Sequence, residues 1–561
     1  MSAVKQDSRE QHYSRLDQAF AGFLGARSGL QAAPRQRFMA VVRELCCAQH
    51  NGHSCIRLGA QDQDIVRSSG MADDGCEGRT MPLVLENDRL YLQRYWYYET
   101  RLARQLRAMA ACRSAVVVAA ADLDRYFPSV EEATDWQREA ALCALRQGLS
   151  VITGGPGTGK TSTVVKILAL LQEFSPQPLH IALAAPTGKA AMRLQEAIGH
   201  SKASLPCTAS VQQHIPESVT TIHRLLGARP PSPFFRHCAE TPLPHDLVVI
   251  DEASMVDLAL MSKLVDALKK GARLILLGDK DQLASVESGA VLADLTVALP
   301  AHTLELKKSY RFEAAIKNLA DSVNRQQPEQ AWRLLLRGGK NITLLTEKIV
   351  EEIVLQQTDY LERIRQGCDY AAIYRSFSAF QVLCATRRGK NSVQSVNLQV
   401  QQRLVEQRLI DADEQWYSGR PVMITQNDAN MHLYNGDIGI CLPDREQDGK
   451  LMVFFQRPDG SVKKYLPARL PHCETVFAMT IHKSQGSEFD RVLIMLPEKM
   501  NPVLTKELLY TAITRARKMV TVVANAEVFA WTVNTSVERY GGLAEKLRAD
   551  AVLPPGDAGV S

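Results

Sequence analysis

The chain has 561 residues, of which 23% are charged and 45% hydrophobic, and its formal net charge is +5. This length predicts three or four domains, and the composition is that of an ordinary globular protein. No apolar run approaches the roughly 18 residues of a membrane helix. The polar start, Met1–Asp7, lacks the apolar core of a signal peptide, so we expect a cytoplasmic protein. The small positive charge is compatible with nucleic-acid binding but does not demand it.

The 12 cysteines are scattered and form no C-x-x-C pair, which is typical of reduced thiols in a cytosolic protein. One local group has the residue types that zinc prefers: Cys46, Cys47, His50, His53 and Cys55. Its spacing matches no standard ligand pair, so a structural role is the prediction and a metal site the alternative.

The first 120 residues carry no catalytic pattern and predict a mainly helical domain. Apolar residues have helical spacing over residues 13–23, 35–49 and 95–109. Residues 82–92 alternate around a polar turn, which indicates a hairpin. We expect residues 1–120 to form an accessory or docking domain.

The next segment, Gly154–Thr161, fits the phosphate-binding pattern G-x-x-x-x-G-K-[ST]. It follows an apolar strand-like run at 149–152 and precedes a helix-forming run at 163–172. In this context, backbone N–H groups and the helix N-terminus bind phosphate. Lys160 would reach the β- and γ-phosphates, and Thr161 would hold Mg²⁺. The alternative is an ordinary glycine-rich turn.

Apolar strands then alternate with helices, which predicts a parallel sheet covered on both faces. The expected strands lie at 151–152, 181–185, 247–250 and 274–277, with a Pro/Ser-rich loop at 229–244. We place this first α/β domain at 121–300 and a second at 301–561.

The second α/β domain is expected to carry an insert. Several short strands separated by turns predict a small β-barrel within about 415–470. The tail from about 553 has a composition typical of disorder.

Polar residues at strand ends extend the predicted phosphate site. Asp251 and Glu252 follow an apolar strand, where one carboxylate can hold Mg²⁺ through water and the other can polarise the attacking water. Gln282 follows the next strand and can sense the γ-phosphate or orient the attacking water. Arg311 and Arg515 supply guanidinium groups for the charge of a transferring phosphoryl group. Solvated acids and surface ion pairs are the alternatives for each residue taken alone.

These patterns, in this order, resemble superfamily 1 helicases. The motifs span residues 135–525 and read DWQREA (135–140), GGPGTGKT (154–161), APTGKAA (185–191), TIHRLLG (221–227), DEAS (251–254), GDKDQ (278–282), YRF (310–312), AMTIHKSQGSEF (478–489) and YTAITRAR (510–517). TIHRLLG and TIHKSQGSEF are most similar to the RecD family, the alpha subunits of the helicase–nuclease exodeoxyribonuclease V (RecBCD), as is the segment Gly52–Cys55. The short N-terminal region favours this complex-forming type over the long-form, stand-alone relatives.

The resemblance implies an ATP site with Mg²⁺ between two RecA-like P-loop domains, and an SH3-like form for the β-barrel insert. Gln137 would recognise adenine, and Gly486 and Glu488 would contact the nucleotide from the second domain. The remaining nucleotide contacts would be Gly154, Gly155, Pro156, Gly157, Thr158, Gly159, Lys160, Thr161 and Ser162. The metal would be held by Thr161 and Asp251, and catalysis would use Lys160, Asp251, Glu252, Gln282, Arg311 and Arg515. The implied DNA track comprises Pro186, Thr187, Lys189, His223, Asn435, Thr480 and His482.

The implied activity is ATP-dependent 5′-to-3′ DNA unwinding in a complex with RecB-like and RecC-like subunits. That complex processes double-stranded DNA ends for homologous recombination and double-strand break repair, and we expect its nuclease in a partner. The alternatives are a stand-alone helicase, a related enzyme acting on RNA, and a structural subunit with a decayed ATPase. The intact Lys160, Asp251, Glu252 and Arg515 argue against decay.

Overall fold

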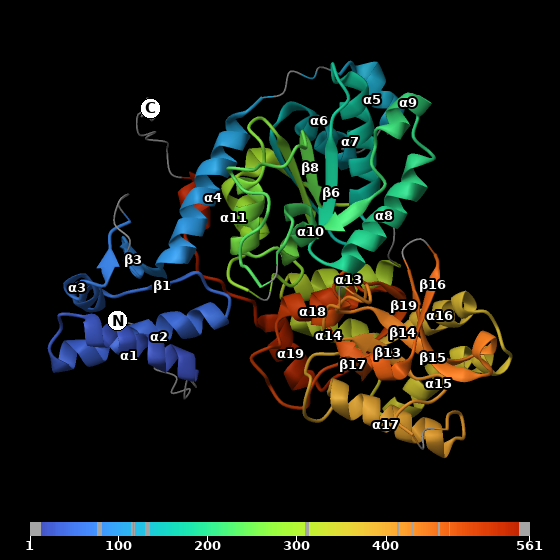
Figure 1. Cartoon of the computed structure of the whole chain (residues 1–561). Coiled ribbons are helices and arrows are strands. Elements are labelled where there is room, and N and C mark those ends of the chain that lie inside the picture. The colour runs from blue at the N-terminus through green and yellow to red at the C-terminus, as the bar shows by residue number, and fades with distance from the viewer. Residues whose placement is uncertain are drawn as a thin grey trace.

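The computed structural model of the chain describes residues 13–75, 81–113, 116, 118–128, 135–229, 231–285, 287–308, 313–411, 414–428, 430–457, 460–470 and 472–548. Figure 1 shows an N-terminal region in blue, a first α/β region with green strands, and a second α/β region in orange and red. Arg311 and the tail expected from about 553 lie outside the described residues.

The N-terminal region combines helices with a four-stranded sheet in the order β1-β4-β3-β2. Its elements are α1 (Arg15–Arg27), α2 (Ala32–His50), β1 (Cys55–Arg57), α3 (Ala60–Ser68), β2 (Ala72–Asp73), β3 (Leu83–Glu86) and β4 (Arg89–Leu92). The predicted hairpin is confirmed, because β3 and β4 pair antiparallel around Asn87, whose φ is +56°. Buried residues such as Phe38, Val42 and Leu45 give this region its own core.

The first α/β region contains a sheet of six parallel strands in the order β10-β5-β9-β8-β6-β7. The strands are β5 (Leu149–Thr153), β6 (Ile181–Ala185), β7 (Val219–Thr221), β8 (Leu247–Ile250), β9 (Arg273–Gly278) and β10 (Thr303–Glu305). The helices are α5 (Ala120–Tyr126), α6 (Trp136–Arg146), α7 (Lys160–Phe174), α8 (Gly188–Lys202), α9 (Ala209–Gln213), α10 (Ile222–Leu226), α11 (Leu258–Asp266) and α12 (Val291–Ala298). The predicted parallel sheet is confirmed.

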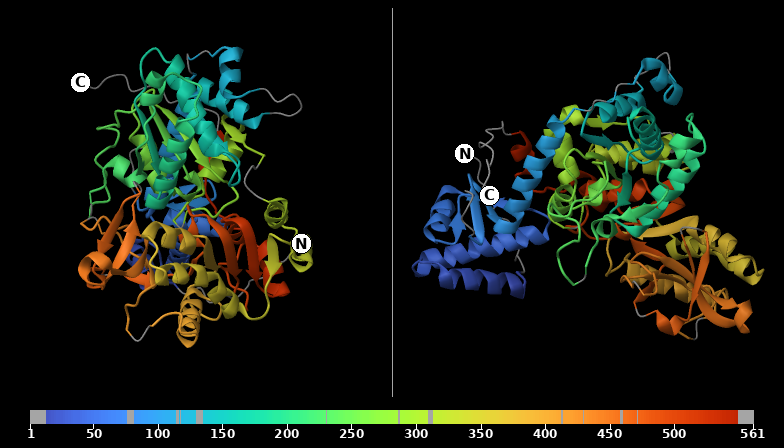
Figure 2. Two further views of the ribbon diagram at one scale, coloured as in Figure 1. Left: turned by 90° about the vertical axis from the view of Figure 1, so that its right-hand side faces the viewer. Right: turned by 45° about the horizontal axis from the view of Figure 1, so that its top comes forward.

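Helices cover both faces of this sheet. Alternate residues of its strands point to opposite sides, so apolar side chains on both faces need to be buried. On β8, Leu247 and Val249 pack with α6, α7 and α8, whereas Val248 and Ile250 pack on the opposite side with α10 and α11. That second side is also covered by α4 (Gln93–Ala111) and α20 (Leu543–Arg548), which pack against each other. Figures 1 and 2 show the blue helix α4 running from the N-terminal region to this sheet.

Three segments lie differently from the expected domain boundaries. β10 joins the first sheet although it follows residue 300. Helix α4 contributes Leu102 and Leu106 to the core of the first sheet although it precedes residue 121. The C-terminal segment returns across the molecule to pack beside α4. All three placements depend on apolar side chains that meet only in the folded chain, so local spacing could not reveal them.

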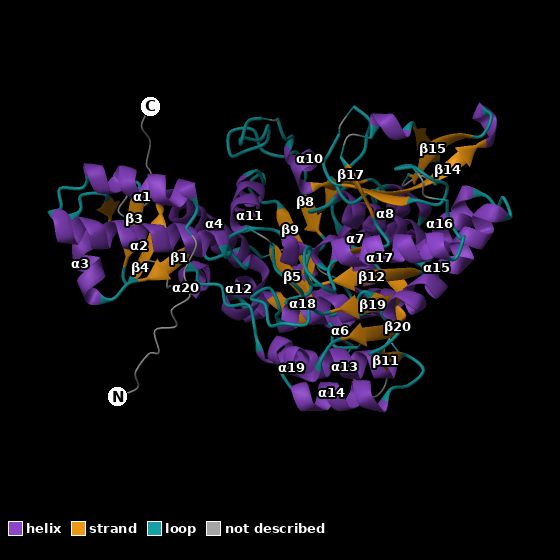
Figure 3. Cartoon of the chain, turned by 90° about the horizontal axis from the view of Figure 1, so that it is seen from below, coloured by secondary structure: helices purple, strands orange, loops and turns teal. Residues whose placement is uncertain are grey.

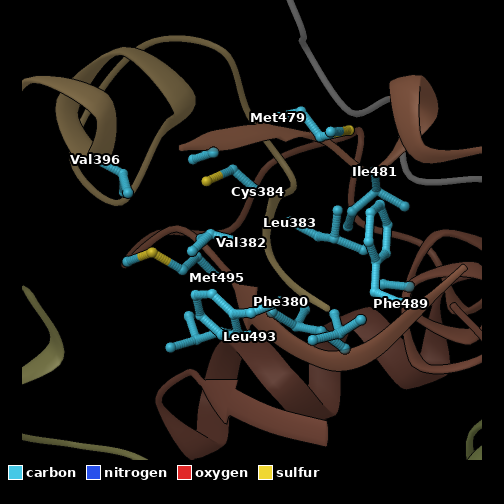
Figure 4. Packing of buried hydrophobic residues seen from close by; sticks show 14 of the residues in the cluster. Phe380, Val382, Leu383, Cys384, Val396, Met479, Ile481, Phe489, Leu493 and Met495 are labelled. Carbon is cyan, nitrogen blue, oxygen red and sulfur yellow. The ribbon is translucent and has the colours of Figure 1, made fainter. Parts of the chain in front are cut away.

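The second α/β region contains five parallel strands in the order β11-β20-β19-β12-β18. They are β11 (Ile342–Leu344), β12 (Phe380–Cys384), β18 (Ala478–Thr480), β19 (Phe489–Met495) and β20 (Ala516–Val523). The helices are α13 (Ala314–Asn324), α14 (Pro328–Arg337), α15 (Ile349–Arg365), α16 (Tyr370–Ser378), α17 (Val393–Glu406), α18 (Lys506–Ile513) and α19 (Ala526–Asn534). Figure 4 shows the core of this region, where Val382 of β12 and its partner Leu493 of β19 are both buried.

The insert expected at 415–470 is a five-stranded antiparallel sheet in the order β16-β15-β14-β13-β17. Its strands are β13 (Pro421–Ile424), β14 (Ile438–Asp444), β15 (Lys450–Gln456), β16 (Val462–Tyr465) and β17 (Cys473–Thr475). One face packs on the second α/β region, where the hydroxyl of Tyr370 donates to the carbonyl oxygen of Phe454 at 2.6 Å. Figure 3 shows β14 and β15 beside α16. Closure into an SH3-like barrel stays a prediction.

Two expectations from composition concern membranes and metals. Among the described residues, no helix is both long enough and apolar enough to cross a membrane. The same residues contain no group of three or more histidine, cysteine or acidic side chains placed to hold a metal ion. Within the cysteine–histidine group, Cys46 and Cys55 are buried, and the ring of His53 stacks on Tyr540.

Candidate active site

The phosphate-binding pattern forms a loop between β5 and α7. Gly157 and Gly159 have φ values of +78° and +83°, in the left-handed region that favours glycine. A Cβ on Gly159 would lie 2.6 Å from the side-chain nitrogen of Gln137, which also donates to the carbonyl oxygen of Thr158 at 3.3 Å. The Lys160 ammonium group donates to the carbonyl oxygens of Gly154 and Gly155 at 2.6 and 3.1 Å. The turn therefore holds both predicted side chains against its own backbone.

Gln137 reaches the loop because Asp135 caps helix α6. The Asp135 carboxylate accepts from the backbone N–H groups of Gln137 and Arg138 at 3.0 and 3.2 Å. These groups have no partner within the helix, so the cap satisfies them and fixes where the helix begins.

The two predicted carboxylates follow β8. Burial raises the pKa of Asp251 above its usual range, the charge of Glu252 raises it further, and Lys160 opposes both effects. Glu252 has a φ of +51°, and its backbone N–H donates to the Asp251 carboxylate at 2.9 Å. A non-glycine residue in this conformation stores strain, which is common at functional sites. A half-buried carboxylate that lines the cleft near a lysine ammonium suits a cation-dependent site.

A hydrogen-bonded chain crosses from the first sheet to the second. The Gln282 side chain donates to Asp279 at 3.0 Å and accepts from the Arg515 guanidinium at 2.7 Å. The Tyr510 hydroxyl donates to the same Asp279 oxygen at 3.2 Å. Burial raises the pKa of Asp279 to about 6. Asp279 and Tyr510 lie in motifs that the sequence identified, but their contact was not predicted.

Glu488 forms a second link between the α/β regions. It pairs with Arg193 of α8 at 2.9 Å and with Arg517 at 3.0 Å. Arg193 also donates to the carbonyl oxygen of Gly486 at 2.9 Å. Sequence reasoning missed Arg193, because nothing in the spacing of α8 separates it from an ordinary surface arginine.

These links border a cleft of about 530 Å³ between the two α/β regions. Predicted residues that line it are Pro156, Gly157, Gly159, Lys160, Thr161, Ser162, Asp251, Glu252, Gln282, Gly486, Glu488 and Arg515. Arg193 and Arg517 also line it. Most of the predicted ATP site is therefore brought together.

Three of the segments predicted to contact DNA converge near Lys189. The pKa of Lys189 is lowered to about 8, chiefly by burial and also by the charges of Arg193 and Lys483, whereas Asp437 opposes the shift. The Lys189 side chain passes 3.9 Å from the Cβ position of Gly436, which follows the predicted Asn435. Pro186 and Thr187 precede Lys189 after β6, and Thr187 caps α8.

The other predicted DNA contacts lie on two further elements. Thr480 ends β18, and its hydroxyl accepts from the backbone N–H of Lys483 at 3.3 Å. Burial lowers the pKa of His482, which lies in the same turn. His223 is exposed on α10, with its ring tilted against Phe235 at 5.8 Å. The geometry thus groups the segments at 186–189, 435–437 and 480–483, and places His223 on a separate element.

Comparison with known proteins agrees with this geometry. Residues 137–288 match the family described as AAA domain, and residues 475–523 match the UvrD-like helicase C-terminal domain. RecBCD enzyme subunit RecD of Mycolicibacterium smegmatis is 42% identical over 486 residues, covering 85% of each chain. The subunit of the same name from Haemophilus influenzae is 35% identical, covering 83% of this chain and 81% of the relative. The ATP-dependent RecD2 DNA helicase of Deinococcus radiodurans is 32% identical, covering 82% of this chain and 59% of the relative.

Proposed function

Because the chain belongs to the RecD family of RecBCD enzyme subunits, we propose that it is an ATP-dependent DNA helicase motor within such a complex. The observation that carries this proposal is the cleft shared by the two parallel sheets. Lys160, Asp251 and Gln282 enter it from the first sheet, whereas Glu488 and Arg515 enter it from the second. In such a cleft, nucleotide binding can change the relative orientation of the two domains.

The residues around the cleft fit ATP with Mg²⁺. The positive-φ glycines and the Lys160 ammonium group suit phosphate, and the Asp251 carboxylate suits a divalent cation. When bound, ATP supplies a γ-phosphoryl group for transfer to water, and Mg²⁺ neutralises the phosphate oxygens. Thr161 and Asp251 would hold the cation.

The remaining residues would divide the catalytic work. Lys160 neutralises the β- and γ-phosphates, and Glu252 polarises the attacking water. Gln282 orients that water, while Arg515 places its positive charge next to the transferring phosphoryl group. By resemblance, Arg311 adds a second guanidinium group, and Gln137 recognises adenine.

Movement along DNA would follow from opening and closing of the cleft. If the segments at 186–189, 435–437 and 480–483 grip single-stranded DNA with different strength in the two states, each cycle of hydrolysis moves the chain along the strand. The direction proposed from the resemblance is 5′ to 3′.

The partners proposed are RecB-like and RecC-like subunits, and the process is repair of double-strand breaks by homologous recombination. The nuclease of the complex would reside in a partner. The N-terminal region is the proposed docking surface. On its helix α1, Leu16 is 73% exposed and lines an apolar groove, and Phe23 on the same helix is 52% exposed. Exposed apolar residues gathered in this way are typical of protein interfaces.

The activity is tested by ATP hydrolysis with the purified chain, comparing single-stranded DNA, RNA and no nucleic acid. We expect hydrolysis to be stimulated most by DNA, and unwinding to require a 5′ overhang on the substrate. Stimulation by RNA alone, or unwinding from a 3′ overhang, would contradict the corresponding part of the proposal.

Docking is tested by co-purification with the RecB-like and RecC-like subunits. The double substitution Leu16→Glu with Phe23→Glu should abolish co-purification and leave ATP hydrolysis unchanged. The control is Leu336→Glu on α14, where the side chain is 63% exposed but lies in the second α/β region. If the double variant still co-purifies with both subunits, docking uses another surface.

A further inference from the structure

The segment that follows Gln282 is held by an arginine from the far end of the chain. Arg539 lies between α19 and α20, where the chain leaves the second α/β region. One terminal nitrogen of its guanidinium donates to the carbonyl oxygens of Glu287 and Gly289 at 2.7 and 2.8 Å and to the Ser285 hydroxyl at 3.3 Å. The other donates to the carbonyl oxygen of Ser285. One half-buried side chain therefore contacts three residues of this segment.

Arg539 is itself anchored to the N-terminal region. The backbone N–H of Tyr540 donates to the His53 ring at 2.9 Å, and the Tyr540 carbonyl oxygen accepts from the backbone N–H of Ser54 at 2.9 Å. The two rings stack with centroids 5.2 Å apart. The backbone N–H of Gly542 donates to both oxygens of the buried Glu99 carboxylate at 3.1 Å. These contacts hold the backbone next to Arg539 in place against the N-terminal region.

The N-terminal region also contacts the held segment directly. The backbone N–H of Gly289 donates to the Gly52 carbonyl oxygen at 3.0 Å, and the Ser288 hydroxyl donates to the Gln49 carbonyl oxygen at 3.2 Å. Gly52 has a φ of +87°, and a Cβ there would lie 2.9 Å from the guanidinium carbon of Arg539. The glycine lets the end of α2 approach the guanidinium closely.

The other end of the segment is held by the second α/β region. The backbone N–H of Leu283 donates to the Thr511 hydroxyl at 2.9 Å, and its carbonyl oxygen accepts from Gln485 at 3.0 Å. The neighbouring Gln282 accepts from Arg515 at 2.7 Å. Gln282 thus lies seven residues before Gly289, the residue whose backbone N–H is bonded to the N-terminal region.

We propose that Arg539 is a positioning residue for the ATPase, which clamps the described residues of 283–289 to the N-terminal region and so sets Gln282 in the cleft. The planar guanidinium has five N–H donors and can bind several carbonyl oxygens at once, which a lysine ammonium cannot do in this arrangement. A shift of about 1 Å in a residue that positions reacting atoms can cost roughly 100-fold in rate. The inference rests on the proposed function, because it assigns Gln282 to ATP hydrolysis.

The kinetic test uses the full chain with Arg539→Ala and Arg539→Lys. We expect kcat for DNA-stimulated ATP hydrolysis to fall roughly tenfold or more in both variants, while KM for ATP changes less than about threefold, because phosphate contacts remain. The matched control is Arg548→Ala, which removes an arginine that donates to the Val297 carbonyl oxygen at 3.0 Å, outside the held segment. That control should keep kcat within about twofold.

Amide hydrogen exchange tests the clamp without relying on activity. Arg539→Ala should speed exchange at Leu283 and Gly289, whereas Arg548→Ala should not. If Arg539→Ala unfolds at the assay temperature, Arg539→Lys decides, because it keeps the aliphatic stem and one charge. Unchanged exchange in the folded Arg539 variants overturns the clamp. Faster exchange with unchanged kcat overturns the positioning role.

These outcomes are distinct from failure of the proposed function. A wild-type chain that hydrolyses no ATP under any nucleic-acid condition contradicts the helicase proposal and, with it, the positioning of Gln282 for hydrolysis. The exchange measurement then decides for or against the clamp alone.

Discussion

Replacement of Arg515 by alanine should leave nucleotide binding largely intact and lower the rate of hydrolysis. Arg515 is only 2% exposed, and its guanidinium donates to Gln282 at 2.7 Å, to the Ser487 carbonyl oxygen at 3.2 Å and to the Thr511 carbonyl oxygen at 3.1 Å. It links the second α/β region to Gln282. Its charge would be worth most in the transition state, when negative charge spreads over the phosphoryl oxygens.

The expected loss of hydrolysis rate follows from the transition-state stabilisation that such an arginine provides. An arginine that stabilises phosphoryl transfer contributes roughly 10³-fold or more, which corresponds to about 4 kcal/mol of activation free energy. The substitution also leaves three buried acceptors without this donor, and each loss costs about 1–3 kcal/mol of stability. Arg515→Lys retains a charge but lacks the fork of donors, so it should recover part of the stability and little of the rate.

The assay is single-turnover ATP hydrolysis at saturating single-stranded DNA, with nucleotide affinity measured separately. Unfolding temperature is recorded to confirm that the variants are folded. Lys518→Ala is the matched control, since Lys518 lies three residues further along, its side chain is 71% exposed, and it pairs with Asp490. A tenfold loss of nucleotide affinity with unchanged turnover would make Arg515 a binding residue and refute the reasoning.

Three further predictions concern single residues. Lys160→Ala should reduce hydrolysis to background with little change in unfolding temperature, because its ammonium donates to carbonyl oxygens of its own loop and is not part of the apolar core. Near-normal turnover would remove Lys160 from the mechanism. Burial raises the pKa of Asp279 from 3.8 to about 6, so the folded chain binds this proton more tightly than the unfolded chain, and stability falls as the pH rises from about 4 through 6. Asp279→Asn should therefore raise the unfolding temperature more at pH 8 than at pH 5, reflecting roughly 3 kcal/mol at most, and an equal gain at both pH values would contradict this sign. Leu106→Ala should destabilise the chain by about 2–5 kcal/mol in denaturant unfolding, because Leu106 is fully buried against the first sheet. The control Leu16→Ala, at an exposed position, should cost less than about 0.5 kcal/mol. Equal effects of the two substitutions would refute this placement of α4.

The sequence by itself determined the local parts of the candidate site. The loop at 154–161 and the acids after the strand at 247–250 were recognisable because their chemistry depends on short spacings within one strand, one turn and one helix. The first parallel sheet followed for the same reason, since each of its predicted strands is a short apolar run, whereas the second was implied by the family resemblance. Carboxyl ends of parallel strands meet at one sheet edge, so the grouping of Lys160, Asp251 and Gln282 was also predictable.

Only the tertiary structure decided the contacts between distant segments. Gln282 and Arg515 lie 233 positions apart, and the Ser54 hydroxyl meets the Tyr540 carbonyl oxygen across 486 positions. The pairing of Arg193 with Glu488, the placement of α4 and α20 on the first sheet, and the hold of Arg539 on Ser285 and Gly289 share this character. A side chain in such a contact carries no local pattern, because its partner is chosen by how whole sheets and helices pack.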